Sequence, residues 1–304
     1  MGFLRQPLSL LLVRFPNKYV LVGGERAIGS VDLNRVTEFY QPASLDAVPE
    51  WQEGFAWLAG GTWLFSEPQP SVRALIDLDS LAWPALQVLP EGLVIASTCK
   101  IAELEAFRAP SEWKAASLIP ECCHALLASF KIWNTASVGG NICLALPAGA
   151  MISLTAALEG VATIWTLDKA SRQVPIVDFV TGNHRHVLAP SELLRSILLP
   201  ADALRKRCAF RRFSLTGVGR SSVFVIGTLC PITGALRITV TASTVRPVAL
   251  EFDYYPDPAE LAAALDENVR SDLYFDDPHG TVEHRRHLTS YYAEEIRNEL
   301  QADD

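Results

Sequence analysis

Short apolar segments, separated by glycine, proline and polar residues, recur along the chain from Val36 onward. Four-residue apolar runs that end at turn-forming residues predict buried strands, and three of them lie at 55–58, 74–77 and 93–96. Segments with helical spacing of apolar residues predict helices at 101–107, 121–127 and 153–158. The alternating segment 162–167 predicts a strand with one buried face. The pattern therefore predicts a mixed fold of helices and strands.

The final third of the chain repeats this mixture. Strands are predicted at 208–213, 223–229 and 236–242, and helices at 257–267 and 281–300. The segment Pro200 to Lys206 is rich in polar residues and predicts a connection between two domains. The fold class is therefore α+β, with one domain over residues 31–203 and a smaller α+β domain over residues 204–304.

The first thirty residues differ from the rest of the sequence. They carry Arg5, Arg14, Lys18 and Arg26 against the single acidic residue Glu25. Their apolar run is too short for a secretory signal. Residues 1–30 are thus predicted to be a leader that is disordered or an over-called extension, and we hypothesise that the native chain starts at Val31.

Composition narrows the classes of function. Hydrophobic residues make up 49% of the chain and charged residues 20%, which suits a subunit that hides part of its surface against partners. The net charge of -8 argues against a nucleic-acid partner, because phosphate backbones attract basic surfaces. No segment has the continuous apolar length of a membrane span. The six cysteines form no C-x-x-C pair, which predicts no iron–sulfur cluster in this chain and favours a reducing, cytoplasmic location.

Other reactive side chains predict little chemistry. His184 with His186, and His284 with His287, could each supply two metal ligands, but neither pair has an evident third ligand, so no metal site is predicted. Cys122 and Cys123 lie in an apolar helix, where inert packing is favoured over redox activity. No nucleophile–base pair is evident, so no catalytic side chain is predicted.

Two glycine-rich turns are the strongest candidates for a binding site. The first, Ala59-Gly60-Gly61-Thr62, directly follows a predicted strand. Two glycines let the backbone turn sharply and bring its N–H groups close to an anion such as a diphosphate. The adjacent Trp63 could stack on a ligand or partner, or pack in the core, and the sequence does not decide between these roles.

The second turn, Ser137-Val138-Gly139-Gly140-Asn141, repeats this composition. Each turn taken singly is equally consistent with a structural loop. A diphosphate with a nucleoside at each end is a ligand that would need both turns. Neither turn fits the dinucleotide fingerprint or the P-loop pattern.

Several motifs occur together in the order of one known family. They are FYQPAS at 39–44, LAGGT at 58–62, IWNTASVGGN at 132–141, VPIVDF at 174–179 and PSELL at 190–194. With these motifs the chain resembles the FAD-binding medium subunit of molybdenum hydroxylases, the family of xanthine dehydrogenase and carbon monoxide dehydrogenase. The resemblance runs from about Val36 to near the C-terminus, where residues 280–287 match more loosely.

The resemblance implies a fold, a cofactor and partners. The fold would be a two-subdomain flavin-binding fold, of the vanillyl-alcohol-oxidase-like FAD domain type, followed by the small C-terminal domain. The cofactor would be FAD, which performs its own redox chemistry while the protein binds and orients it. The partners would be a large molybdopterin-binding subunit and a small subunit with two-iron two-sulfur clusters. Electrons would pass through FAD to a final acceptor, for which NAD is one candidate.

The resemblance also assigns roles to residues. Leu58, Ala59, Gly60, Gly61, Thr62, Trp63 and Leu64 would surround the diphosphate and approach the flavin. Ser137, Gly139, Gly140 and Asn141 would hold its other side. Leu193 and Leu194 would pack near the isoalloxazine or adenine, or belong to an ordinary strand core. Arg211 would be a basic neighbour of the flavin, or half of a surface pair with Arg212.

Three departures from the family pattern concern the cofactor and the acceptor. Ala150 stands where the family commonly has an aspartate that bonds a ribose, and Trp133 replaces the usual arginine before Asn134. Loss of one charged hydrogen bond costs about 1.5–3 kcal/mol. The segment after Arg211 lacks the usual acidic residue. Two alternatives therefore accompany the main hypothesis: a structural subunit that has lost tight FAD binding, and a stand-alone FAD-dependent oxidase.

Overall fold

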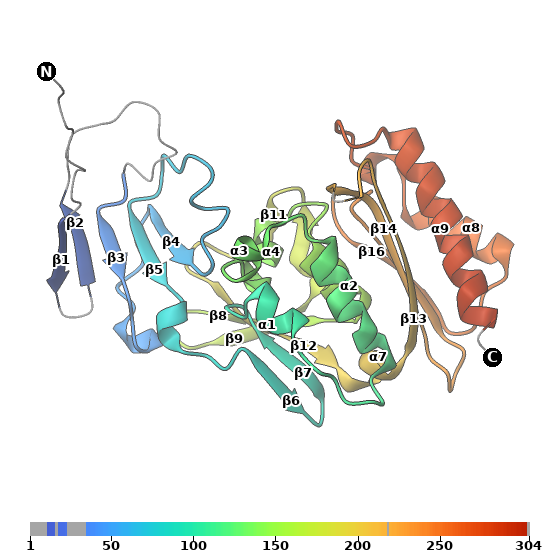
Figure 1. Ribbon diagram of the computed structural model, residues 1–304, viewed down its shortest axis with the longest axis horizontal. Helices are drawn as coiled ribbons and strands as arrows, with labels where there is room; N and C mark the ends of the chain where they lie inside the picture. Colours follow the sequence, from blue (N-terminus) through green and yellow to red (C-terminus); the bar gives the residue numbers. More distant parts are fainter. Residues whose placement is uncertain (1–10, 16–17, 23–34, 218, 303–304) are drawn as a thin grey trace, which may run out of the picture. The chain divides into compact units, whose positions relative to one another are not determined.

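The computed structural model describes residues 11–15, 18–22, 35–217 and 219–302, which form two compact units (Figure 1). Unit 1 comprises Met1–Trp83 with Leu167–Lys169, and unit 2 comprises Pro84–Thr166 with Ala170–Asp304. Most of the predicted leader at 1–30 lies outside the described residues, which include only two strands of it, Leu11–Phe15 and Lys18–Val22. The predicted domain limits at 31–203 and 204–304 stay predictions.

Unit 1 is built on one five-stranded sheet in the order β1-β2-β3-β5-β4. Its strands are β1 (Leu11–Phe15), β2 (Lys18–Val22), β3 (Glu38–Tyr40), β4 (Phe55–Leu58) and β5 (Ala74–Asp77). The last three are parallel to one another, and short 3₁₀ turns follow β3 and β5 at Leu45–Ala47 and Asp79–Leu81. A small core under this sheet contains Leu58 and Leu75. The strands predicted at 55–58 and 74–77 are confirmed.

Unit 2 begins with a five-stranded antiparallel sheet in the order β6-β7-β12-β8-β9. Its strands are β6 (Leu86–Leu89), β7 (Gly92–Ala96), β12 (Leu193–Pro200), β8 (Val161–Trp165) and β9 (Ser171–Pro175). In β8, Ala162 and Ile164 are buried while their neighbours are half-buried. This alternation confirms the predicted strand with one buried face.

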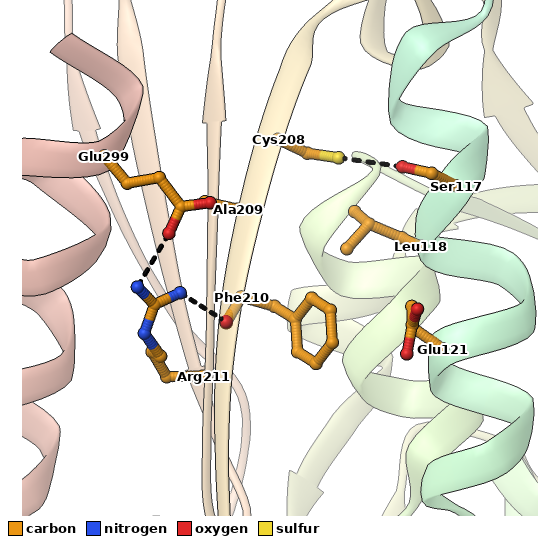
Figure 2. Close-up of a pocket in the computed structure, with 8 residues that line it drawn as sticks. All are labelled: Ser117, Leu118, Glu121, Cys208, Ala209, Phe210, Arg211 and Glu299. Atoms are coloured by element: carbon orange, nitrogen blue, oxygen red, sulfur yellow. Dashed lines mark hydrogen bonds and ion pairs between the residues drawn. The ribbon is translucent and has the colours of Figure 1, made fainter. Parts of the chain in front are cut away.

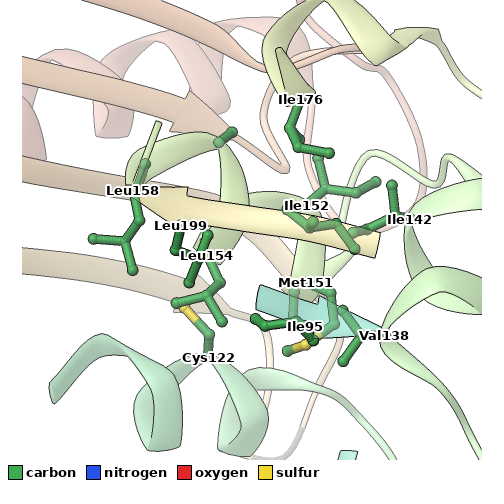
Figure 3. Packing of buried hydrophobic residues seen from close by; sticks show 14 of the residues in the cluster. Ile95, Cys122, Val138, Ile142, Met151, Ile152, Leu154, Leu158, Ile176 and Leu199 are labelled. Carbon is green, nitrogen blue, oxygen red and sulfur yellow. The ribbon is translucent and has the colours of Figure 1, made fainter. Parts of the chain in front are cut away.

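Short helices and one small hairpin complete this part of unit 2. They are α1 (Ile101–Glu105), the 3₁₀ helix η3 (Lys114–Ser117), α2 (Leu118–Ala125), α3 (Phe130–Trp133), α4 (Val138–Leu144), α5 (Ala150–Ala157), α6 (Ile176–Phe179), β10 (Val180–Gly182) and β11 (Arg185–His186). All eight residues of α5 are buried, and this helix lies in the middle of the main core (Figure 3). The helix predicted at 121–127 instead spans 118–125, because Leu118 and Ile119 also belong to this core.

The C-terminal third forms a four-stranded antiparallel sheet in the order β13-β14-β15-β16, followed by two helices (Figure 1). The elements are β13 (Arg207–Ser214), β14 (Ser221–Leu229), β15 (Leu236–Thr241), β16 (Val248–Phe252), α8 (Pro258–Asn268), the 3₁₀ turn Ser271–Leu273 and α9 (Val282–Ala302). Alternate residues of β14 face opposite cores: Val225 packs in the cluster that contains Ile296 of α9, and Phe224 in the core around α5. Helices therefore cover both faces of this sheet.

The segment predicted as a polar connection at 200–206 joins β12 to β13 and contains a short helix. Residues Ala201–Arg205 form helix α7, in which Ala203 is 1% exposed and Leu204 is fully buried. Asp202 and Arg205 pair with each other at 3.0 Å on its exposed side. The polar composition therefore belongs to one side of a short amphipathic helix, whose other side packs in the core. Within the part of the chain that the structure describes, no helix is long and apolar enough to cross a membrane.

Candidate functional site

The first glycine turn directly follows β4 in unit 1. Leu58 is 8% exposed, and its carbonyl accepts a hydrogen bond from the Leu78 N–H at 2.7 Å, which fixes the end of the strand. Gly61 has a φ of 68°, a left-handed conformation that side chains disfavour. A Cβ at Gly61 would also lie 2.5 Å from Cε2 of Phe65. This turn therefore favours glycine at position 61.

The backbone of this turn leaves its donors unpaired. Carbonyl groups in the turn are used: the Gly61 carbonyl accepts from the Phe65 N–H at 2.9 Å. By contrast, the N–H groups of Gly60, Gly61 and Thr62 donate no hydrogen bond to any residue that the structure describes. These three residues are half-buried. Consecutive unpaired N–H groups on a half-buried turn form a suitable site for an anion, so these residues fit a diphosphate.

Two aromatic side chains beside the first turn are exposed. Trp63 is 42% exposed and Phe65 is 48% exposed, whereas Leu64 packs against the small core of unit 1. The exposure of Trp63 does not favour core packing for this side chain. The indole thus lies largely outside the core of unit 1.

The second glycine turn is the beginning of a helix rather than a loop. Ser137 has extended backbone and is the N-cap of α4, and its Oγ accepts a hydrogen bond from the Gly140 N–H at 3.1 Å. The Val138 and Gly139 N–H groups donate to the carbonyls of Cys99 and Ser97, each at 2.9 Å. The amides here are thus engaged within the fold, in contrast to those of the first turn.

The two glycines of α4 have different environments. Gly139 is buried, and a Cβ there would lie 2.3 Å from Cβ of Ser97, so glycine allows α4 to pack closely against the end of β7. Gly140 is exposed, and the nearest atom to a Cβ there is Oγ of Ser137, at 2.9 Å. Gly140 is therefore the position at which a ligand could approach the backbone of this helix.

Asn141 has a structural partner. Its Oδ1 accepts a hydrogen bond from the Met151 N–H at 3.0 Å, in the first turn of α5. The residue that caps α5, Gly149, offers no side chain for this purpose, and the next residue, Ala150, is 1% exposed. Asn141 thus satisfies a donor at the start of a helix ten residues later in the chain.

The other predicted site residues fall in two places. Leu193 and Leu194 are 1% and 3% exposed within β12, which supports their assignment to the strand core. They lie near the second turn, because the Ser97 N–H donates to the carbonyl of Arg195 at 3.1 Å while Ser97 accepts from Gly139. Arg211 lies in the other sheet of unit 2, where its guanidinium pairs with Glu295 at 3.0 Å and Glu299 at 2.7 Å.

Residues that the sequence analysis did not single out lie before the second turn. Leu127 is 61% exposed and Phe130, the first residue of α3, is 72% exposed. Both are large apolar side chains that lie exposed a few residues before Ser137. The sequence feature that could have identified them is an apolar segment that is too short and irregular to form a buried helix.

The cysteines and histidines provide no further site. Cys122 and Cys123 are fully buried, and burial raises the pKa of Cys123 to about 12, which supports the packing interpretation. Among the described residues, no group of three histidine, cysteine or carboxylate side chains is arranged to hold a metal ion.

Comparisons with known proteins identify the family and the fold. Residues 34–202 match the family described as the FAD binding domain in molybdopterin dehydrogenase. Xanthine dehydrogenase from Oryza sativa subsp. japonica is 33% identical over 121 residues, which are 38% of this chain and 9% of the rice enzyme. The chain therefore spans a small part of the length of that relative.

Solved structures show the same fold over most of the chain. Quinoline 2-oxidoreductase from Pseudomonas putida 86 aligns with a TM-score of 0.66 and 18% identity, over 81% of this chain and 90% of the matched chain. Carbon monoxide dehydrogenase from Hydrogenophaga pseudoflava aligns with a TM-score of 0.70 and 19% identity, over 87% and 96%.

The family match over residues 34–202 and the fold shared with the solved structures place the chain among flavin-binding proteins of the α+β class. Because the family match covers more than half of its length, the chain belongs to the FAD-binding domain family of molybdopterin dehydrogenases. The predicted family, fold class and FAD cofactor are confirmed.

Proposed function

We propose that this chain is the FAD-binding subunit of a molybdenum hydroxylase complex. It accepts electrons from the two-iron two-sulfur clusters of a small partner subunit and passes them through FAD to a final acceptor. A large molybdopterin-binding subunit oxidises the substrate, and NAD is one candidate for the acceptor. Membership of the FAD-binding domain family supports this role.

The single observation that carries the proposal is the row of N–H groups at Gly60, Gly61 and Thr62. None of the three donates a hydrogen bond to a residue that the structure describes. Because these residues are only half-buried, a ligand can reach their N–H groups. A diphosphate would satisfy them without any charged side chain, and the Thr62 hydroxyl could add one more donor. The chain's residues thus bind and orient the cofactor, while FAD when bound supplies the redox chemistry.

The remaining roles follow from where side chains lie within each unit. Exposed Trp63 offers an aromatic surface next to the first turn. Gly140 offers a close approach to the first turn of α4, and Leu127 and Phe130 provide exposed apolar surface nearby in the sequence. We assign these residues to contacts with FAD or with the electron-donating partner. Asn141 and Gly139 act through the fold, because the Asn141 amide oxygen and the Gly139 N–H have protein partners.

The test is a reductive titration of the complex purified with its partner subunits. The expected result is a flavin absorption band that bleaches as substrate is added and returns with an oxidant. A complex that turns over without any flavin band would rule the proposal out. The Gly61→Ala variant of the same complex is the matched control, because it should lose the flavin band while the partner subunits remain bound.

A second candidate function is a structural subunit that no longer holds FAD tightly. It is motivated by Ala150, which is buried where a carboxylate would otherwise sit at the start of α5. A ligand that binds only the folded state raises its stability. Purified chain that stays colourless, and whose melting temperature does not rise with added FAD, would favour this second function.

A further inference from the structure

Strand β13 lies at one edge of the C-terminal sheet. One side of it pairs with β14 along its whole length, and no strand in the described part of the chain pairs with its other side. All but one of its residues are half-buried, whereas every residue of β14 and β15 is buried. An edge of this kind presents a row of backbone N–H and C=O groups to which another strand can be added.

A pocket of ≈ 360 Å³ lies along this edge (Figure 2). It is lined by Ser117, Leu118, Glu121, Cys208, Ala209, Phe210, Arg211 and Glu299. Its walls thus come from η3 and α2 on one side of the strand and from α9 on the other. Its volume is at the small end of the range for small-molecule sites, about 300–1,000 Å³. It therefore suits one long side chain better than a cofactor.

The wall toward α2 combines an aromatic ring with a carboxylate. Phe210 projects from β13 toward α2, where Leu118 and exposed Glu121 face it (Figure 2). Cys208 is held at this wall by Ser117, with Sγ and Oγ 3.3 Å apart. A ring face next to a carboxylate favours a cation over a neutral or acidic group.

The wall toward α9 carries more carboxylates than positively charged groups. Arg211 pairs with Glu299, which lines the pocket, and with Glu295. Counted with Glu121 on the α2 wall, the pocket and its border carry three carboxylates and one guanidinium. Arg211 Nη1 also donates to the Phe210 carbonyl at 2.9 Å, so a side chain occupies a backbone acceptor of β13. An incoming strand could replace this bond, because Arg211 keeps its two carboxylate partners.

We propose that the edge of β13 binds an extended segment of a partner polypeptide by strand addition. A lysine or arginine side chain of that segment enters the pocket lined by Glu121, Phe210 and Glu299. In this mode, main-chain hydrogen bonds provide affinity and the pocket selects the side chain. The negative excess around the pocket commits the occupant to a basic segment. The proposal is independent of FAD binding.

The experiment uses the purified full chain and a labelled peptide of about nine residues, the upper range of strand length, with alternating threonine and valine and one central lysine. Fluorescence anisotropy should show saturable binding below about 1 mM. A peptide with central glutamate should bind at least about tenfold more weakly, and a peptide N-methylated at alternate residues should not bind. Hydrogen exchange of the residues in β13 should slow when the lysine peptide is added.

Variants locate the binding to the pocket. Glu121→Lys should weaken binding of the lysine peptide by about tenfold or more, because it replaces an attraction by a repulsion. Glu267→Lys, an equal charge change at an exposed residue of α8 that does not line the pocket, should leave binding unchanged. Both substitutions are at exposed positions, and equal melting temperatures confirm that they fold.

Three results would overturn the proposal. The first is the absence of binding by the lysine peptide at about 1 mM. The second is binding that neither Glu121→Lys nor the central glutamate weakens. The third is a concentration-dependent dimer of the chain that Glu121→Lys disrupts, because the occupant would then be a second copy of the chain and not a basic segment of a partner.

Discussion

Asn141 and Met151 are joined by a hydrogen bond of 3.0 Å from the Met151 N–H to the Asn141 side-chain oxygen. This bond connects the second glycine motif to the first turn of the buried helix α5. It also fixes the surroundings of Ala150, the residue between Gly149 and Met151, which is 1% exposed. A change at Ala150 is therefore expected to act on the second glycine motif.

Ala150→Asp is predicted to tighten FAD binding. A carboxylate at the start of α5 would be favoured by the helix N-terminus and could accept a hydrogen bond from a ribose hydroxyl. A hydrogen bond to a charged group contributes about 1.5–3 kcal/mol, so the dissociation constant should fall by about 10- to 100-fold. Titration of apoprotein with FAD, followed by flavin fluorescence, measures this. Ala150→Asn is the control and should gain less; an unchanged affinity in folded Ala150→Asp would contradict the ribose contact.

Gly61→Ala is predicted to abolish retention of FAD. The residue has a φ of 68°, and the added Cβ would meet the Phe65 ring at 2.5 Å, so backbone strain and displacement of this ring are expected to shift the turn and its unpaired amides. Gly234→Ala is a matched control, since Gly234 has a φ of 74° but nothing within 4 Å of its Cβ position. Both variants should lose about 1 kcal/mol or more of stability from backbone strain. Only Gly61→Ala should lose flavin absorbance after gel filtration; retention of flavin in it would exclude this turn from the site.

Arg285→Ala is predicted to destabilise the chain severely. This arginine of α9 is 1% exposed, and its guanidinium bonds to the carbonyls of Ala242 and Gly280 at 2.7 and 3.0 Å and to the largely buried carboxylate of Asp277. Removal of one partner from a buried pair costs about 3–5 kcal/mol. Urea unfolding measures this loss.

The next residue on α9 provides the control for that measurement. Arg286 pairs with Asp266 at 2.8 Å, but the two side chains are 52% and 69% exposed. Exposed pairs contribute about 0–1 kcal/mol, so Arg286→Ala should change the free energy of unfolding by no more than this. Equal losses in the two variants would show that Arg285 does not join α9 to the sheet.

Stability is predicted to fall below about pH 6.5 through His186. Burial lowers the pKa of this imidazole, and its Nδ1 accepts a hydrogen bond from the Leu188 N–H at 3.3 Å, which requires a neutral ring. The unfolded state, with a pKa of about 6.5, therefore binds the proton more readily than the folded state. The contribution is fully present above the unfolded pKa and is lost as the pH falls through the folded pKa.

Urea midpoints measured across pH 5 to 8 check this dependence. His186→Gln should show a smaller loss of stability on acidification than the parent chain, because glutamine does not titrate. A variant whose midpoint falls as steeply as that of the parent would show that other groups cause the loss.

Much of the fold and part of the site follow from local sequence. The alternation of buried and half-buried residues at 162–165 and the apolar runs at 55–58 and 93–96 identify strands. Successive side chains of a strand point to opposite faces, so this pattern can be read from adjacent residues. Two adjacent glycines after a strand likewise identify the first turn. The buried helix α5 was located only in part, since a helix that is apolar on all sides has no amphipathic period.

The sequence by itself indicated the family and FAD through its motifs, several of the strands and helices, and the position of the first glycine turn. Only the tertiary structure decided which backbone N–H groups of the two glycine motifs remain without a hydrogen-bond partner in the part of the chain that it describes. It leaves the amides of Gly60, Gly61 and Thr62 without partners among the described residues, and it engages the amides of Val138 and Gly139 with carbonyls about forty residues earlier in the chain. It also pairs Arg211 with carboxylates on α9. The physical reason is that such bonds join residues distant in sequence, whereas local patterns reflect only the backbone period and the character of adjacent side chains.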